Sequence, residues 1–165
     1  METRPVGPPS EVHHQSPEFR QLTESLREES PRPPPTLLLF TGTSRAELRT
    51  AAEDLATGLG RPLLHVDLNA VSDKYIGETE KNLRESLARA EADDAILFFD
   101  EADALFGKRT EIKDAHDRYA RIELSRVQEI LADYAGIAIG LVQSPVDPAR
   151  RWSKAKCVIV KFPPK

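Results

Sequence analysis

Residues 96–108 read Ile-Leu-Phe-Phe-Asp-Glu-Ala-Asp-Ala-Leu-Phe-Gly-Lys, and this stretch decides the predicted fold. Its first four residues have the length and composition of a buried strand, which ends at two adjacent carboxylates, Asp100 and Glu101. Two acids in this position can hold a hydrated magnesium ion and polarise a water molecule. Without a metal they should repel each other, so we expect Asp100→Asn to be neutral or stabilising. The stretch predicts a strand with a polar site at its carboxyl end.

From residue 36 onward, short apolar runs alternate with segments that have helical spacing. The strands are predicted at 37–40, 62–66, 95–99, 137–142 and 158–162, and the helices at 48–56, 78–92 and 114–134. Short buried strands that alternate with helices predict a parallel sheet with helices on both faces. In such folds ligands bind at the carboxyl ends of the strands.

Residues 1–35 contain eight of the 13 prolines, a composition that disfavours regular core structure. Within this segment, residues 17–29 fit one short amphipathic helix that begins with a proline. We therefore expect a flexible tail over 1–35 and one α/β domain over 36–165, which is long enough to fold alone.

Composition limits the function classes. A net charge of -4 argues against binding to nucleic acid or to an anionic membrane by overall charge. Residues 150–165 carry six basic residues and no acid, and they either face a phosphate or acidic neighbour or form a solvated tail. The single cysteine, Cys157, excludes an internal disulfide. We find no secretory signal and no apolar run long enough to span a bilayer, and we expect a cytoplasmic location.

The first predicted strand runs into residues 42–50, Gly-Thr-Ser-Arg-Ala-Glu-Leu-Arg-Thr. In a P-loop the equivalent turn is rich in glycine and ends in Gly-Lys-Ser/Thr, where backbone amides and the lysine hold phosphates. Counted from Gly42, Glu47 replaces the glycine, Leu48 the lysine and Arg49 the magnesium-binding hydroxyl. A shift of one residue aligns Arg49-Thr50 with Lys-Thr but places Leu48 at the glycine.

This loop is therefore a degenerate phosphate loop in our interpretation. No glycine lies between Gly42 and Gly58, so the backbone cannot easily approach a pyrophosphate. Glu47 would also place a negative charge beside the phosphates. The candidate nucleotide-binding residues are Gly42, Thr43, Ser44, Leu48, Arg49 and Thr50.

Residues 72–84 read Ser-Asp-Lys-Tyr-Ile-Gly-Glu-Thr-Glu-Lys-Asn-Leu-Arg. Together with residues 96–109, this block resembles the core of AAA+ ATPases in order and spacing, over about residues 36–163. The resemblance implies a P-loop NTPase-like three-layer α/β sandwich with a five-stranded parallel sheet in the order 5-1-4-3-2. It also implies ATP and magnesium as cofactors and a ring of AAA+ subunits, formed with itself or with a paralogue.

The resemblance assigns roles to single residues. Asp100 matches the magnesium-organising acid, Glu101 the base that orients the lytic water, and Gln143 the position where the family usually has a water-positioning asparagine. The first pore loop, which grips a polypeptide substrate, matches Tyr75, Ile76 and Gly77; Tyr75 could instead be a partly buried loop aromatic. Weak candidates for arginine fingers are Arg150 and Arg151, which are out of step with the family pattern. The sequence after the fifth strand is too short for the family's helical lid, so we expect none.

These features favour a degenerate AAA+ module, a pseudo-ATPase with a scaffold or regulatory role in an AAA+ assembly. ATP and magnesium should then bind weakly or not at all, and the isolated chain should not be an active enzyme. One alternative is an ATP-hydrolysing remodelling factor whose atypical phosphate loop is completed by a partner. Another is a decayed gene product that retains the fold without a selected activity.

Overall fold

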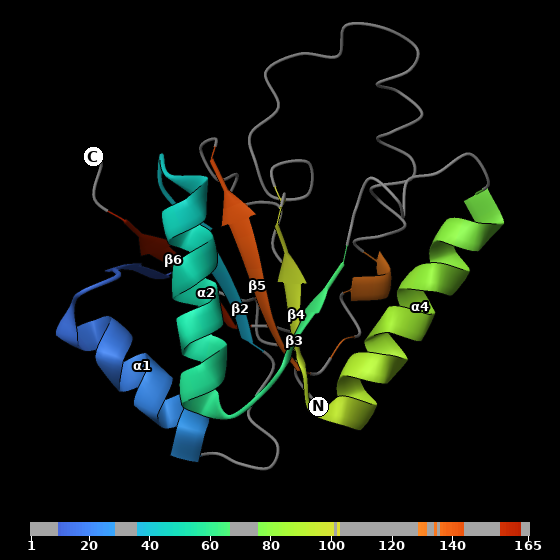
Figure 1. The fold of residues 1–165 in the computed structure, drawn as a ribbon, viewed down its shortest axis with the longest axis horizontal. Helices are drawn as coiled ribbons and strands as arrows, with labels where there is room; N and C mark the ends of the chain where they lie inside the picture. The colour runs from blue at the N-terminus through green and yellow to red at the C-terminus, as the bar shows by residue number, and fades with distance from the viewer. Residues whose placement is uncertain are drawn as a thin grey trace, which may run out of the picture.

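A computed structural model describes residues 10–28, 36–66, 76–100, 102, 129–131, 134, 136–143 and 156–162. Three helices and six strands are defined within these ranges. The helices are α1 (Pro17–Glu28), α2 (Arg45–Leu59) and α4 (Ile76–Asp93). The strands are β1 (Ser10–His13), β2 (Thr36–Thr41), β3 (Leu63–His65), β4 (Ile96–Phe99), β5 (Ile137–Val142) and β6 (Lys156–Lys161). Figure 1 shows the strands side by side with helices on either side of them.

The six strands form one sheet in the order β1-β6-β2-β5-β4-β3, and every pair is parallel. Five of these strands are the predicted ones, and they have the predicted order when numbered along the chain. The prediction of five strands was wrong by one, because β1 pairs with β6 at the edge of the sheet. Ser10–His13 reads Ser-Glu-Val-His, and a strand of this length with a single aliphatic residue gives no apolar run to recognise.

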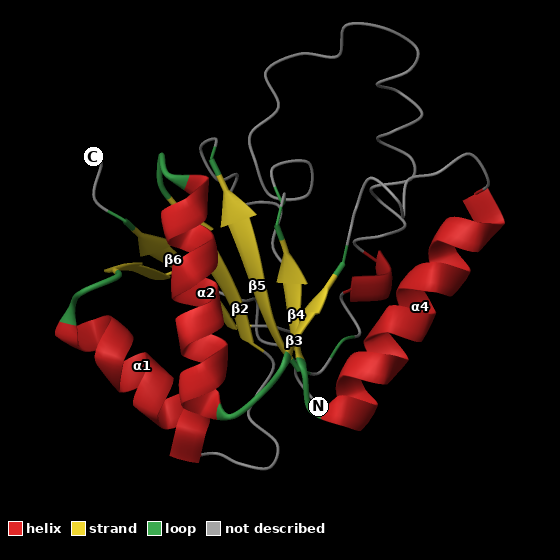
Figure 2. Cartoon of the chain, viewed as in Figure 1, coloured by secondary structure: helices red, strands yellow, loops and turns green. Residues whose placement is uncertain are grey.

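Alternate residues of each strand point to opposite faces, and each face has its own hydrophobic cluster. Leu38, Phe40 and Phe98 belong to the cluster that packs under α1 and α2. Leu37, Leu39 and Phe99 belong to the other cluster, together with residues of α4. The molecule is thus the expected three-layer sandwich, with α1 and α2 on one face and α4 on the other (Figure 2).

The N-terminal segment contributes more structure than its composition predicts. Helix α1 coincides with the predicted short amphipathic helix, and Ser16 caps it by accepting a hydrogen bond from the Phe19 amide at 3.2 Å. Phe19 and Leu26 are buried in the same cluster as α2. Residues 10–28 therefore pack against the α/β domain. Their few apolar side chains are widely spaced, so the proline-rich composition dominated the prediction from sequence.

The ends of α2 follow from local chemistry. The Ser44 hydroxyl accepts a hydrogen bond from the Glu47 amide at 3.3 Å and begins the helix. Gly60 ends it with a φ of 67°, a left-handed conformation that glycine adopts without strain. Helix α2 is thereby fixed directly after the carboxyl end of β2, where the candidate site lies.

The predicted helix over 114–134 lies largely outside the described residues. Within this range, the structure describes residues 129–131, which are helical, and Tyr134. Leu131 and Tyr134 are buried against the same face of the sheet as α4. The glycine expected to end this helix, Gly136, is required for a steric reason, since a Cβ there would lie 2.5 Å from the Tyr134 hydroxyl.

Candidate functional site

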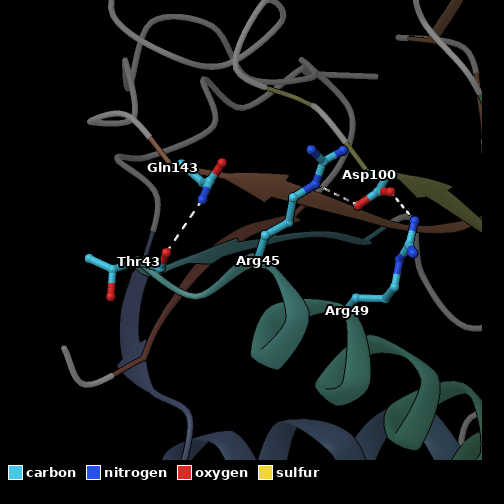
Figure 3. A network of polar contacts seen from close by, with 5 residues as sticks. All are labelled: Thr43, Arg45, Arg49, Asp100 and Gln143. Carbon is cyan, nitrogen blue, oxygen red and sulfur yellow. Dashed lines mark hydrogen bonds and ion pairs between the residues drawn. The ribbon is translucent and has the colours of Figure 1, made fainter. Parts of the chain in front are cut away.

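Three strands bring the candidate residues to one edge of the sheet. The carboxyl ends of β2, β5 and β4, which are neighbours in the sheet, lead to Thr43, Gln143 and Asp100 respectively. Figure 3 shows these three residues around the start of α2, together with Arg45 and Arg49. We call these five residues the strand-end site. Parallel strands make this convergence inevitable, because their carboxyl ends lie on the same side.

The Gln143 side chain links two of the strand ends. Its Nε2 atom donates a hydrogen bond to the Thr43 carbonyl oxygen at 3.4 Å. The amide of the residue at the end of β5 therefore contacts the backbone of the loop that follows β2. This contact places Gln143 at the strand-end site and gives its side chain a partner within the protein.

Asp100 is held by two arginines. Its Oδ1 atom lies 3.3 Å from Nε of Arg45, and its Oδ2 atom pairs with Nη2 of Arg49. The two arginines are four residues apart on α2, so both side chains project from the same side of the helix near its start. Each oxygen of the carboxylate thus has a guanidinium partner (Figure 3).

The pairing is partly shielded from solvent. The Asp100 side chain is 22% exposed, whereas those of Arg45 and Arg49 are 44% and 48% exposed. Pairs this open contribute about 0.2 to 1 kcal/mol each to stability because water screens the charges. They place two positive charges against the Asp100 carboxylate.

The residue in the place of the phosphate-binding lysine faces the core. Leu48 is fully buried in the cluster beneath α2, and its amide donates to the Ser44 carbonyl at 3.1 Å. Helix α2 already begins at Arg45, so only residues 42–44 separate β2 from the helix. A phosphate loop needs several free backbone amides around the anion. Here the amides of Glu47 and Leu48 are bonded to Ser44.

Gly42 is tightly enclosed. A Cβ at this position would lie 3.0 Å from Cβ of Phe162 and 3.2 Å from Cδ2 of Leu48. Its small size serves the packing between β2, β6 and α2. Gly42 therefore has a structural role regardless of any ligand.

The remaining candidates differ in where they lie and in whether the structure describes them. Thr43, Arg49 and Thr50 are exposed, and Ser44 is partly buried as the helix cap. Ile76 and Gly77, predicted in a loop, form the first turn of α4. The other predicted site residues lie outside the described part of the chain: Glu101, Tyr75, Arg150 and Arg151.

Arg45 is the functional candidate that the motif analysis missed. The P-loop pattern assigns no role to position 45. It assigns roles to the positions that Glu47 and Leu48 occupy. The available signal was a pair of arginines with helical i,i+4 spacing directly after a strand, opposite an acid that ends another strand.

Positive side chains already contact the carboxylate of the strand-end site. Magnesium binds one or two carboxylates together with phosphate oxygens and waters, and both oxygens of Asp100 already face positive charges. No group of three or more histidine, cysteine or acidic side chains within the described ranges could hold a metal ion.

The sequence matches a known family over most of its length. Residues 49–159 match the family described as "ATPase family associated with various cellular activities (AAA)". The chain belongs to the AAA family. The fold described above, with its parallel sheet and the acid after β4, agrees with this assignment.

Several AAA proteins are similar to the chain. It is 35% identical over 85 residues to "Uncharacterized AAA family ATPase y4kL" of Sinorhizobium fredii, covering 52% of this chain and 26% of the relative. It is 29% identical over 150 residues to "AAA ATPase forming ring-shaped complexes" of Kocuria rhizophila, covering 80% and 25%. It is 34% identical over 90 residues to "26S proteasome subunit RPT4" of Saccharomyces cerevisiae, covering 53% and 20%.

These AAA relatives are much longer than the matched region. The chain spans 26%, 25% and 20% of their lengths, so the similarity concerns a part of each relative. Among the described helices of this AAA chain, none is both long and apolar enough to cross a membrane.

Proposed function

We propose that this AAA domain is a pseudo-ATPase, with a scaffold or regulatory role in an assembly of AAA proteins. The observation that carries the proposal is the pairing of Asp100 with Arg45 and Arg49. The family acid that organises magnesium is here neutralised by the chain's own guanidinium groups. A magnesium ion at the same carboxylate would meet two nearby positive charges and would have to displace them.

The phosphate side of the site supports the same proposal. Leu48, at the lysine position, is buried in the core and offers no charge to an anion. The Ser44 hydroxyl accepts a hydrogen bond from the Glu47 amide as a helix cap. Helix α2 begins at Arg45, at a position where a P-loop would still surround the phosphates. We infer that ATP and magnesium bind weakly or not at all, although AAA proteins in general use both.

The proposed role lies in assembly. One relative is named for forming ring-shaped complexes and another as a proteasome subunit. We propose that this chain takes a place in a ring with an AAA paralogue or with copies of itself, and that Tyr75, preceding α4, contacts a polypeptide substrate. We further propose that Glu101, Arg150 and Arg151 are relics of the family's catalytic and finger positions. We expect these roles to be exercised in the cytoplasm.

Nucleotide titration tests the proposal. We expect isothermal calorimetry with Mg-ATP to give no binding heat at micromolar nucleotide, and thermal melting to be unchanged, since a ligand that binds the native state must stabilise it. A clear rise in melting temperature at micromolar Mg-ATP would overturn the proposal.

A double variant tests the proposed cause. Replacing Arg45 by Ala and Arg49 by Thr frees both oxygens of Asp100 and restores a hydroxyl at the magnesium position. We expect this variant to bind magnesium more tightly than the unmodified protein does. The matched control replaces Arg84 and Arg89, on the helix of the opposite face, by Ala. If the control gains as much affinity, Asp100 is not the carboxylate that the arginines neutralise.

A second candidate is an ATPase whose loop is completed by a partner. The observation that favours it is the contact of Gln143 with Thr43, which keeps an amide at the family's water-sensing strand end. This candidate requires magnesium-dependent ATP hydrolysis in the presence of an AAA partner, lost on Asp100→Asn. Hydrolysis that survives Asp100→Asn belongs to the partner's own site.

A further inference from the structure

The N-terminal segment makes a compact set of contacts that the proposed function does not use. It consists of β1, the turn after it and α1, residues 10–28, and we call it the clasp. Strand β1 covers the outer edge of β6 over four residue pairs, from Ser10 with Val158 to His13 with Lys161. Figure 1 shows α1 beside α2 on the same face of the sheet.

An aromatic cluster fastens the clasp. The His14 ring stacks on Phe162 with centroids 4.2 Å apart and planes inclined by 19°. It also lies 5.5 Å from the Phe19 ring of α1. Phe162 in turn packs 5.3 Å from Phe40 of β2 and closely against Gly42. His14 therefore joins the clasp to Phe162, which follows β6 and itself packs against the first residue of the loop after β2.

Further contacts attach the clasp to the domain. Beyond the four residue pairs of β1 and β6, the His14 amide donates a hydrogen bond to the Lys161 carbonyl oxygen at 2.9 Å. The ion pair of Glu11 with Lys161, at 3.1 Å, has both side chains about half exposed and adds little. Phe19 and Leu26 are its buried apolar residues. A terminal segment at the edge of a sheet can open locally without unfolding of the whole domain.

We propose that the clasp is closed on the edge of β6 while the His14 ring is neutral and is released when that ring is protonated. The stack on Phe162 and the contact with Phe19 place the partly buried ring against apolar surfaces. A charge on the ring would have to be desolvated in this position, whereas in the released segment it is hydrated. Protonation therefore favours the open state.

The charged groups around His14 modify this effect. Burial lowers the pKa of His14 below its ordinary value of 6.5, and the acids Glu47 and Asp54 of α2 partly offset that by raising it. On the other described elements, Arg20 of α1 lines the same surface hollow as His14, and Lys161 of β6 is paired with Glu11. The position of the ring against Phe162 and Phe19 gives the direction of the switch, and the lowered pKa agrees with it.

The sign follows from proton linkage. With the pKa lower in the closed state, the released segment binds the proton more tightly. Above pH 6.5 the ring is neutral in both states and the clasp keeps its full stability. As the pH falls below that value and through the closed-state pKa, stability is lost. The clasp is therefore closed at neutral pH and weakened at mildly acidic pH.

Hydrogen exchange followed by NMR tests the clasp. The probe is the His14 amide, with amides of β5 as internal reference, at about pH 7.5 and about pH 5.5 after correction for intrinsic rates. We expect protection of the His14 amide to fall severalfold at the lower pH while β5 stays protected. Unchanged or increased protection of the probe would overturn the proposal.

Two matched variants isolate the ring that titrates. His14→Phe keeps an aromatic ring in the stack but cannot be protonated, so it should abolish the acid-induced loss. His13→Phe changes the adjacent histidine, which is exposed, and should leave the loss as in the unmodified protein. An equal loss in His14→Phe overturns the assignment to His14.

A measurement on the unmodified protein completes the test. The ring resonances of His14 should titrate at the pH where its amide loses protection. Two separate midpoints would show that another group releases the segment, and the proposal would then be wrong even if a variant failed to fold.

Discussion

The two sides of the strand-end site differ in what they keep of the AAA family. On the β4 side, a buried apolar strand ends at Asp100, as the family pattern requires. On the β2 side, the loop is short, Leu48 is in the core and two arginines leave the helix toward the acid. Asp100 on one side and Arg45 and Arg49 on the other thus form an ion-pair network across the site. A family motif therefore indicates function only when the groups facing it are also present.

The largest expected effect concerns Leu48. Leu48→Lys places the family's cation at a fully buried position between α2 and the sheet. We expect it to destabilise the protein by about 3 to 5 kcal/mol, because the ammonium group has no buried partner. Chemical denaturation measures the change.

Thr50→Lys, on an exposed position of the same helix, is the matched control and should change stability by less than about 0.5 kcal/mol. A Leu48→Lys variant as stable as this control would mean that residue 48 can turn outward, and the β2 side would then be closer to a working phosphate loop than the comparison implies.

Gly42→Ala should have an intermediate effect. The new Cβ would meet Cβ of Phe162 at 3.0 Å and Cδ2 of Leu48 at 3.2 Å, and overpacking of this kind costs about 1 to 3 kcal/mol. Thermal or urea denaturation provides the measurement.

Gly58→Ala is an informative control because the sign should reverse. Gly58 lies within α2, where a Cβ has its nearest neighbour at 3.7 Å, and alanine favours a helix over glycine by about 1 kcal/mol. If Gly42→Ala is also stabilising, the packing role assigned to Gly42 is incorrect.

The smallest effect is expected at the ion pairs. Asp100→Asn should destabilise the protein by about 0.5 to 1.5 kcal/mol, since it leaves Arg45 and Arg49 close together without the charge between them. The loss should shrink at about 1 M salt, where such charges are screened. This replaces the expectation from sequence that the substitution would be neutral or stabilising.

A double-mutant cycle with Arg49→Gln sharpens the result. If Asp100 and Arg49 interact as described, the double variant should lose less than the sum of the two single losses. Additive losses would mean that the two sides of the site do not interact, and the argument for a neutralised acid would fail.

The sequence was informative wherever a pattern is local. The strand that ends at Asp100 and the helical spacing of Leu48 with Ala52 and Leu55 each satisfy a pattern that burial confirms. The order of five strands came from the resemblance to AAA+ proteins and is also confirmed. The roles of Glu101, Tyr75, Arg150 and Arg151 remain predictions.

The missed features depend on contacts between distant segments. Strand β1 was missed because its register is set by hydrogen bonds to β6, about 150 residues away, and not by its own side chains. Arg45 was missed because its partner Asp100 is 55 residues away in the sequence. The position of Leu48 in the motif indicated a lost cation, but its burial depends on how α2 packs on the sheet.

The fold class could be predicted from the sequence alone, because the alternation of apolar runs and helical spacings dictates which residues must leave water. The sequence also determined that a carboxylate stands at the end of a central strand. Only the tertiary structure decided what that carboxylate meets. Charges interact through space with energies that fall with distance, and the distance between α2 and the end of β4 is fixed by the packing of the whole domain.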